Sequence, residues 1–316
     1  HLLMTDSDTF QIWDVFASKK VRSVKHQHYV LVNGRYVGSV PTTNLSLAWS
    51  PDQRFVAAVA HGSAQVFEVA SGKLSSHWTT DLYWTNAAWS RDSQQVATIA
   101  LSNTAGSTVE VHSATTGHLL RSFPPPPRRP GRGTPRYAAI SWSPDNRLLA
   151  AAGREEDDAI LGVPGAVFLT IWSIASGEPL FTISYDPEDD LHHDSPGSLT
   201  TVWSSDGKQF ALMSNAIGAR LWTLPDDEGI QPLLTYIGSG GPYSQLAWSP
   251  ESRYIALGDG DHREANVVRV FDTTTGQTCF SYRGHAGFIS GLSWSPRGNY
   301  IASSSYDGVH VWQPEL

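Results

Sequence analysis

The chain has 316 residues and a formal net charge of -8 at pH 7, with 40% hydrophobic residues, 27 glycines and 19 prolines. This acidic balance argues against a nucleic-acid groove, which needs a basic surface, and no apolar run is long enough for a membrane-spanning helix. A single cysteine, Cys279, excludes an internal disulfide framework and a Cys-x-x-Cys metal site. We therefore expect a turn-rich protein without nucleic acid or membrane insertion among its interactions.

The chain opens with two short strand-like segments, residues 2–5 and 9–16. An Asn33-Gly34 pair follows between two β-rich runs, residues 29–32 and 35–40, and this arrangement is a strong hairpin signal. The chain starts at His1, inside the first apolar segment, so we expect it to be a fragment of a longer protein.

From residue 49 onward, one tetrapeptide recurs six times. Its copies are Trp49-Ser-Pro-Asp, Trp89-Ser-Arg-Asp, Trp142-Ser-Pro-Asp, Trp203-Ser-Ser-Asp, Trp248-Ser-Pro-Glu and Trp294-Ser-Pro-Arg. They are 40, 53, 61, 45 and 46 residues apart, which indicates a repeating unit with insertions in some copies. Because a repeat array stacks into one body, we expect residues 1–316 to form a single domain.

Each copy predicts four short strands. In the last copy, residues 291–294, 300–303 and 309–312 are the first, second and third strands, and 278–282 is the fourth strand of the copy before it. Seven third strands are predicted, at residues 10–13, 65–67, 109–111, 169–172, 219–222, 268–271 and 309–312. No helical period competes with this pattern.

Apolar residues lie on both faces of these strands, since Val309 and Val311 point one way and Trp312 the other. Sheets that stack face to face around an axis bury both faces, as in a β-propeller. We count seven second strands and seven third strands, but only six first strands and six fourth strands. The prediction is an all-β, seven-bladed propeller of four-stranded antiparallel blades with a half-built first blade, with six or eight blades as alternatives. The missing strands come from upstream of His1 or, alternatively, from the hairpin at residues 29–40.

The final copy resembles a WD repeat. His285 follows Gly284 before its first strand, Ser303 lies in the second strand, Asp307 in the next turn and Trp312 in the third strand. In the WD-repeat family such residues form a buried network in which His joins Asp to Ser and Ser reaches the Trp indole, because a buried indole N–H needs an acceptor. The other copies lack a Gly-His before their Trp-Ser motif. The resemblance is to a bacterial-type member, and in bacteria such propellers are often joined to signalling domains such as protein kinases.

Four insertions, residues 123–136, 154–165, 184–198 and 259–266, fall at one end of the predicted propeller, which in the WD-repeat family is the top face that commonly binds partners. One insertion is basic and proline-rich, so it is predicted to be polyproline II, and two are acidic. The charged residues are Arg128, Arg129 and Arg132 in the first, and Glu155, Glu156, Asp157, Asp158, Asp189 and Asp190 in the others. We expect a surface divided by charge, or else neighbouring loops that neutralise each other.

The residue six positions before the Trp of each tetrapeptide, together with the residue that follows it, resembles the contact residues of the family's top face. The candidates are Tyr83, Trp84, Arg136, Tyr137, Tyr243 and Phe288. Aromatic and Arg side chains are enriched at interface hot spots, which predicts a protein or peptide ligand, although any one of these aromatics can instead cap the blade beneath it.

Residues that could support catalysis do not form a recognised motif. The densest group of potential metal ligands, at residues 186–194, has no recognised spacing, and no catalytic triad order, Gly-x-Ser-x-Gly elbow or P-loop occurs. We expect a monomeric, non-enzymatic interaction scaffold with no catalytic residues, metal or cofactor. The alternative is a small-molecule or metal-dependent propeller enzyme that uses the axial channel.

Overall fold

The structure is a computed structural model, and part of the chain is described in it. The described residues are 2–6, 9–14, 19–25, 31–32, 35–36, 46–60, 63–79, 83–102, 106–130, 132–155, 165–185, 199–214, 218–224, 231–235, 245–258 and 266–316. Every regular element in these ranges is a β-strand, so the predicted all-β class is confirmed. Within the same ranges, no helix is long and apolar enough to cross a membrane.

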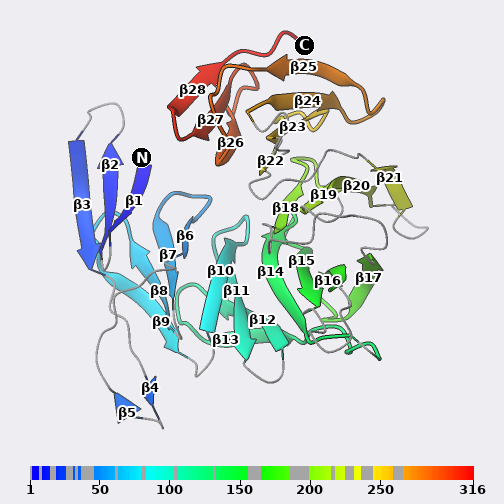
Figure 1. Cartoon of the computed structure of the whole chain (residues 1–316). Helices are drawn as coiled ribbons and strands as arrows, with labels where there is room; N and C mark the ends of the chain where they lie inside the picture. Colours follow the sequence, from blue (N-terminus) through cyan, green and yellow to red (C-terminus); the bar gives the residue numbers. More distant parts are fainter. Residues whose placement is uncertain are drawn as a thin grey trace. The chain divides into compact units, whose positions relative to one another are not determined.

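The strands of the described ranges form seven sheets of three or four strands and one two-stranded hairpin, and strands that are consecutive in the chain are neighbours in each sheet (Figure 1). The first sheet contains β1 (Leu2–Asp6), β2 (Thr9–Asp14) and β3 (Lys19–Lys25), and the hairpin contains β4 (Leu31–Val32) and β5 (Arg35–Tyr36). The next two sheets contain β6 (Ser46–Trp49), β7 (Phe55–Ala60), β8 (Ser63–Glu68) and β9 (Leu74–Thr79), and β10 (Tyr83–Trp89), β11 (Gln95–Ser102), β12 (Gly106–Ser113) and β13 (Leu119–Phe123).

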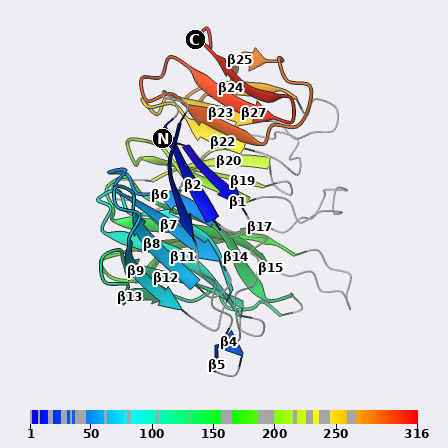
Figure 2. The same ribbon diagram turned by 90° about the vertical axis from the view of Figure 1, so that its left-hand side faces the viewer.

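The remaining four sheets follow the same order. They contain β14 (Pro135–Trp142), β15 (Leu148–Glu155), β16 (Val167–Ser173) and β17 (Pro179–Tyr185); β18 (Leu199–Trp203), β19 (Gln209–Ser214), β20 (Gly218–Thr223) and β21 (Gln231–Thr235); β22 (Gln245–Trp248), β23 (Tyr254–Gly258), β24 (Val268–Asp272) and β25 (Thr278–Tyr282); and β26 (Gly291–Trp294), β27 (Ile301–Ser305) and β28 (Gly308–Trp312). Strands β22 to β25 pair antiparallel and lie side by side in both ribbon views (Figure 1 and Figure 2).

The chain divides into two compact units. One unit contains His1–Arg128, Thr134–Trp142 and Ile174–Gly177, and the other contains Arg129–Gly133, Ser143–Ser173 and Glu178–Leu316. The single domain over residues 1–316 stays a prediction.

Consecutive residues of the middle strands are buried, so both faces of these sheets are covered. In β7, Val56, Ala57, Ala58 and Val59 are at most 1% exposed. Because successive side chains point to opposite faces, Ala57 and Val59 join a core cluster that includes Trp89 from the next sheet, while Val56 and Ala58 join a second cluster on the other face. The predicted burial of both faces is therefore confirmed for this sheet.

The recurring tetrapeptide builds the turn between the first and second strands of each copy. The hydroxyl of Ser50 donates to Oδ1 of Asp52 at 2.6 Å and accepts the main-chain N–H of Phe55 at 2.8 Å. Oδ1 of Asp52 also accepts the N–H of Arg54, and Gln53 takes a left-handed conformation with φ of 60°. The same bond joins Ser90 to Asp92, Ser143 to Asp145 and Ser204 to Asp206. In these four copies the Ser and the Asp thus fix the tight turn that the sequence predicts.

The Trp of the tetrapeptide ties its repeat to the preceding one. Its indole N–H donates to a main-chain carbonyl of the earlier repeat. The acceptor is the residue directly before the Trp of that repeat's own tetrapeptide. The pairs are Trp89 with Ala48 at 2.9 Å, Trp142 with Ala88 at 3.1 Å, Trp248 with Val202 at 3.3 Å and Trp294 with Ala247 at 3.0 Å. These bonds satisfy the indole donors of four of the repeats.

The sheets at the two ends of the chain have three strands each. The described strands include six first strands and six fourth strands, as predicted, but the first sheet has one strand more than the expected half blade. The hairpin is confirmed by the pairing of Leu31 with Tyr36 and Val32 with Arg35. The idea that it supplies the missing strands is wrong, because β4 and β5 form a sheet of their own.

Candidate functional site

The last repeat holds a buried chain of hydrogen bonds. His285, which lies between β25 and β26 and is 3% exposed, contacts Oδ1 of Asp307 through Nδ1 at 2.8 Å and Oγ of Ser303 through Nε2 at 2.7 Å. The indole N–H of Trp312 donates to Oγ of Ser303 at 3.0 Å. The carboxylate of Asp307 can only accept a hydrogen bond, so Nδ1 of His285 carries the proton. The Ser303 hydroxyl then donates its hydrogen bond to Nε2 of His285. The structure thus brings together the four residues that the sequence singles out for a network.

The carboxyl of Asp307 anchors this chain at its outer end. Besides the bond from His285, its Oδ2 accepts the main-chain N–H of Ala286 at 2.8 Å. The hydrogen bond from His285, followed by that from Ala286, holds the pKa of Asp307 below its ordinary value. The loop before β26 is therefore fastened to the turn between β27 and β28.

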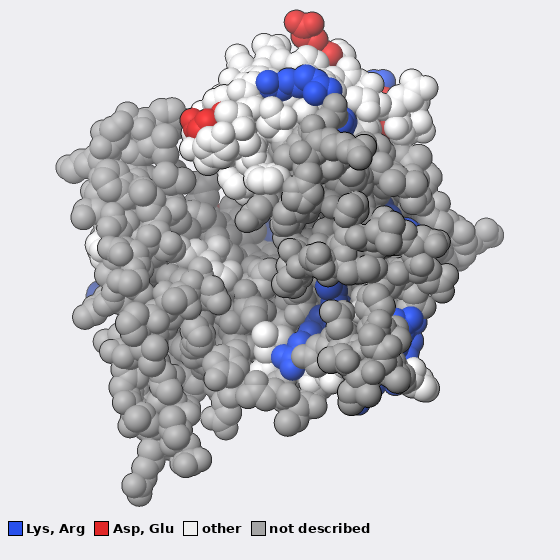
Figure 3. Space-filling model, viewed as in Figure 1, with Lys and Arg blue, Asp and Glu red and all other residues white. Residues whose placement is uncertain are grey.

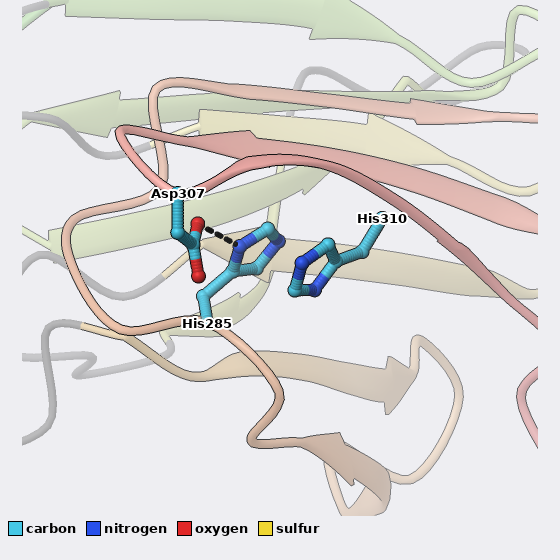
Figure 4. A group of neighbouring side chains, drawn as sticks. All are labelled: His285, Asp307 and His310. Carbon is cyan, nitrogen blue, oxygen red and sulfur yellow. Dashed lines mark hydrogen bonds and ion pairs between the residues drawn. The ribbon is translucent and has the colours of Figure 1, made fainter.

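A second imidazole lies beside the network. The ring of His310 stacks on His285 with centroids 4.0 Å apart and planes 8° from parallel (Figure 4). Nδ1 of His310 is 2.9 Å from the Tyr282 hydroxyl. His285, Asp307 and His310 could each offer a ligand atom to a cation. Both nitrogens of His285 and Nδ1 of His310 already have partners, so a metal would have to replace hydrogen bonds rather than complete an open ligand set. The arrangement fits hydrogen bonding better than metal binding.

The predicted rim residues differ in exposure. Phe288, in the loop before β26, is 37% exposed, and Arg136 in β14 is half-buried. Tyr83 and Trp84 lie in β10, but their side chains are outside the described part of the structure, as is all of Tyr243.

Tyr137 is a correction to the predicted rim. Its side chain is 2% exposed, its main-chain N–H donates to the Ser107 hydroxyl, and its own hydroxyl donates to the carbonyl of Pro124 at 3.3 Å. The ring therefore packs inside the protein and cannot meet a partner.

Arg129 and Glu155, two of the charged residues that were expected to form opposite halves of a divided surface, form an ion pair with each other. Nε of Arg129 lies 2.8 Å from Oε1 of Glu155, and Nη2 lies 2.9 Å from Oε2. Glu155 is 5% exposed, so it is not a surface charge, and this pair follows the neutralising alternative. Arg128 is exposed and Arg132 is half-buried. The acidic candidates Glu156, Asp157, Asp158, Asp189 and Asp190 lie outside the described residues. On the face shown in Figure 3, the described Lys and Arg side chains form several separate groups.

The last repeat also exposes apolar side chains that the sequence pattern did not mark as surface. Val309 and Val311 are 68% and 66% exposed, whereas Val268 and Val270, at the equivalent positions of β24, are fully buried. Tyr306 is 78% exposed, and its hydroxyl donates to the carbonyl of Ala286 at 2.8 Å. The sequence pattern singled out the adjacent Asp307 for the hydrogen-bond network but did not single out Tyr306.

Tyr306 and Phe288 lie at the same end of the last repeat. A Cβ added to Gly287 would overlap the Tyr306 ring, so this ring lies directly against the backbone next to Phe288. The exposed Tyr306 ring thus contacts the glycine that directly precedes the exposed Phe288, and we call Phe288 and Tyr306 the aromatic pair.

Comparisons with known proteins address the family and the fold. Residues 276–312 match the family model "WD domain, G-beta repeat". No curated protein sequence matches the chain. Among solved structures, the β-propeller domain of Cps50 (Swd1) from Myceliophteria thermophila is 13% identical with a TM-score of 0.67, and the match covers 98% of this chain and 92% of that one. A chain of a mitotic checkpoint complex is 16% identical with a TM-score of 0.66, with 97% and 81% covered. The predicted β-propeller fold is confirmed, and residues 276–312 of the chain are similar to a WD repeat.

Proposed function

We propose that this protein is a non-enzymatic scaffold that binds a protein or peptide segment at the loop end of its repeats, with the aromatic pair as the central contact. Arg136, Tyr83, Trp84 and Tyr243 are proposed as further contacts. We also propose that residues 1–316 act as one monomeric domain, the docking part of a signalling protein. This last assignment rests on the resemblance to propellers joined to signalling domains.

The observation that carries the proposal is the exposure of two aromatic rings on a rigid support. Phe288 and Tyr306 are 37% and 78% exposed. The two loops that carry them are joined by the hydrogen bond from the Ala286 N–H to Asp307 and by the bond from the Tyr306 hydroxyl to the Ala286 carbonyl. Aromatic side chains that are fixed before binding lose little conformational entropy when a partner covers them. A chain of the mitotic checkpoint complex, a protein complex, is among the similar structures, which agrees with a binding role.

A catalytic role would need histidines and carboxylates that converge on a free space. The group of this kind in the described part of the chain, His285 with Asp307 and His310, is occupied by hydrogen bonds to Ser303 and Tyr282. This arrangement favours the scaffold over the enzyme.

A peptide library displayed on phage and selected against the 316-residue protein tests the proposal. We expect selected peptides to bind with micromolar dissociation constants, and the double substitution Phe288→Ala with Tyr306→Ala to weaken them about tenfold, or about 1.4 kcal/mol. Tyr300→Ala is the matched control, because Tyr300 is 49% exposed at the opposite end of β26 and β27.

Two results would contradict the proposal. The first is peptide binding that Tyr300→Ala weakens and the aromatic-pair variant does not. The second is a loss of several kcal/mol in unfolding free energy for Phe288→Ala alone, because a true rim side chain leaves the core intact.

A further inference from the structure

The ring of Tyr306 is exposed and at the same time fixed in place. The residue is 78% exposed, and its hydroxyl donates to the Ala286 carbonyl at 2.8 Å. A Cβ added to Gly287 would overlap the ring, so one side of the ring lies against the main chain. An aromatic surface that is held open in this way can receive a ligand without first being ordered.

A carboxylate lies close to this ring. Oδ2 of Asp307 accepts the N–H of Ala286 at 2.8 Å, so the Asp307 carboxylate and the Tyr306 hydroxyl bond to the two main-chain polar groups of one residue. The second bond of the carboxylate comes from Nδ1 of His285 to Oδ1 (Figure 4). The ring and the carboxylate therefore meet at Ala286.

The carboxylate of Asp307 is charged and can accept further hydrogen bonds. The hydrogen bond from His285, followed by that from Ala286, keeps the pKa of Asp307 below its ordinary value, so the group is ionised at neutral pH. A carboxylate has about four acceptor positions, and the described residues donate two hydrogen bonds to this one. The Asp307 side chain is 20% exposed, so a ligand can reach it.

The segments that carry the aromatic pair have a negative charge. Residues 284–290 and 304–310 contain no Lys or Arg and a single carboxylate, that of Asp307. Nε2 of His285 accepts the Ser303 hydroxyl, so this imidazole is neutral. The whole chain has a formal net charge of -8. A cationic ligand is attracted to such a surface, and an anionic one is repelled.

We propose that the aromatic pair binds an arginine side chain of the partner segment, with the guanidinium over the Tyr306 ring and paired with the Asp307 carboxylate. An aromatic face attracts a cation, and Arg is found there more often than Lys. The planar guanidinium can stack on a ring and donate to a carboxylate at the same time. Phe288 offers apolar surface to the aliphatic part of the arginine. This inference rests on the proposed function and narrows its partner to a segment that contains arginine.

Peptides selected by phage display against the 316-residue protein test the inference, because synthetic copies can carry citrulline in place of arginine. Citrulline has nearly the shape of arginine but no charge. We expect the selected peptides to contain arginine, and the change of one arginine to citrulline to raise the dissociation constant about tenfold, or about 1.4 kcal/mol. Calorimetry at low and at high salt measures this difference, which should shrink at high salt because exposed charges are screened.

Two sets of variants locate the arginine on the protein. Asp307→Asn removes the charge, so the change to citrulline should then matter less than it does on the unchanged protein. Tyr306→Leu keeps an apolar side chain without an aromatic face, so it should weaken the arginine peptide more than Tyr306→Phe, which keeps the ring. Thermal unfolding shows whether Asp307→Asn is folded, and the Tyr306 comparison decides the matter if it is not. Tyr300→Ala is the control outside the site.

The outcomes separate this inference from the proposed function. Peptides that need the aromatic pair but bind equally well with citrulline would overturn the arginine site and leave the proposed function in place. Peptides that bind regardless of the aromatic pair, or a selection that yields no peptide, would overturn both. Selected peptides rich in Asp and Glu, with binding that Arg283→Gln abolishes, would make this a surface for acidic segments and also overturn the arginine site.

Discussion

The indole of Trp312 lies parallel to the phenol ring of Tyr282, with centroids 4.5 Å apart and planes 4° from parallel. Tyr282 is in β25, the last strand of one repeat, and Trp312 is in β28, the third strand of the next. Trp78 stacks in the same way on the ring of His112 at 4.5 Å, and Tyr185 contacts Trp222 at 6.3 Å with the ring planes tilted by 48°. A ring of the fourth strand thus packs on a ring of the following repeat, and such pairs add to the stabilisation from buried area.

Trp312→Ala should lower the free energy of unfolding by about 3 to 5 kcal/mol, because it removes a large buried aromatic group. Trp312→Phe keeps a ring against Tyr282 and loses the bond to Ser303, so its cost should be smaller, about 1 to 2 kcal/mol. Urea unfolding followed by circular dichroism measures both. Equal costs for the two variants would mean that the ring contact with Tyr282 contributes little.

Ser303→Ala should cost about 1 to 3 kcal/mol, because the Trp312 N–H and Nε2 of His285 then lose a partner in the protein interior. Combined with Trp312→Phe, it should cost less than the sum of the two single changes, since the donor and its acceptor are removed together. Ser293→Ala, on the exposed side of β26, is the control. Strict additivity in this double-mutant cycle would show that the two groups are not coupled.

Asp272 should make stability depend on pH. It caps the turn after β24, where its Oδ1 accepts the Thr274 hydroxyl and the N–H groups of Thr274 and Thr275. The Thr274 hydroxyl is the largest cause that lowers the pKa of Asp272, from 3.8 to about 2. A carboxyl with a lowered folded pKa stabilises the protein above its unfolded pKa, and this contribution is lost as the pH falls from about 4 through about 2.

Urea midpoints measured between pH 5 and pH 2 test this dependence. The midpoint of the unchanged protein should fall through that window, and Asp272→Asn should flatten the fall. Thr274→Val, which removes the hydroxyl and keeps the carboxyl, should make the fall smaller, because the folded pKa of Asp272 then lies closer to its unfolded value. Identical slopes for all three proteins would assign the acid sensitivity to other groups.

Gly117→Ala and Gly177→Ala should differ although both glycines are left-handed, with φ of 72° and 79°. A Cβ at Gly117 would lie 2.6 Å from the main-chain oxygen of His77, whereas at Gly177 the nearest atom is Nη1 of the flexible Arg121 side chain at 3.2 Å. Both substitutions incur the left-handed penalty of about 1 to 2 kcal/mol, and Gly117→Ala must also displace backbone. Thermal unfolding should rank Gly117→Ala as clearly less stable. The reverse order would mean that the β9 backbone at His77 shifts easily.

Strand boundaries could be predicted best where turn residues mark both ends. The predicted strands at residues 291–294 and 278–282 coincide with β26 and β25, because the Trp-Ser turn and a preceding Thr-Gly turn bound them. The second strand of the last repeat was placed at residues 300–303 and occurs at Ile301–Ser305. The N–H of Tyr300 is still part of the turn, since it donates to the Ser295 hydroxyl.

Burial at the candidate site could not be predicted from spacing. Arg136 and Tyr137 are neighbours in β14, so they point to opposite faces, and which face meets the interior depends on the contact of Tyr137 with Pro124. Glu155 pairs with a residue 26 positions earlier, which local pattern cannot show. The exposure of Val309 depends on what lies next to the last sheet, because the strand pattern of β28 matches that of the buried β24.

The indole bonds between repeats have a direction along the chain. For the bonds of Trp89, Trp142, Trp248 and Trp294, the acceptor carbonyl precedes the donor by 41, 54, 46 and 47 residues. During synthesis, each later repeat therefore finds its acceptor already made, so the repeats can dock one after another as they emerge from the ribosome. If synthesis pauses between two repeats, the repeat already made has an unpaired acceptor carbonyl, which can bond with water. The indole N–H that needs this acceptor belongs to the later repeat and has not yet been made.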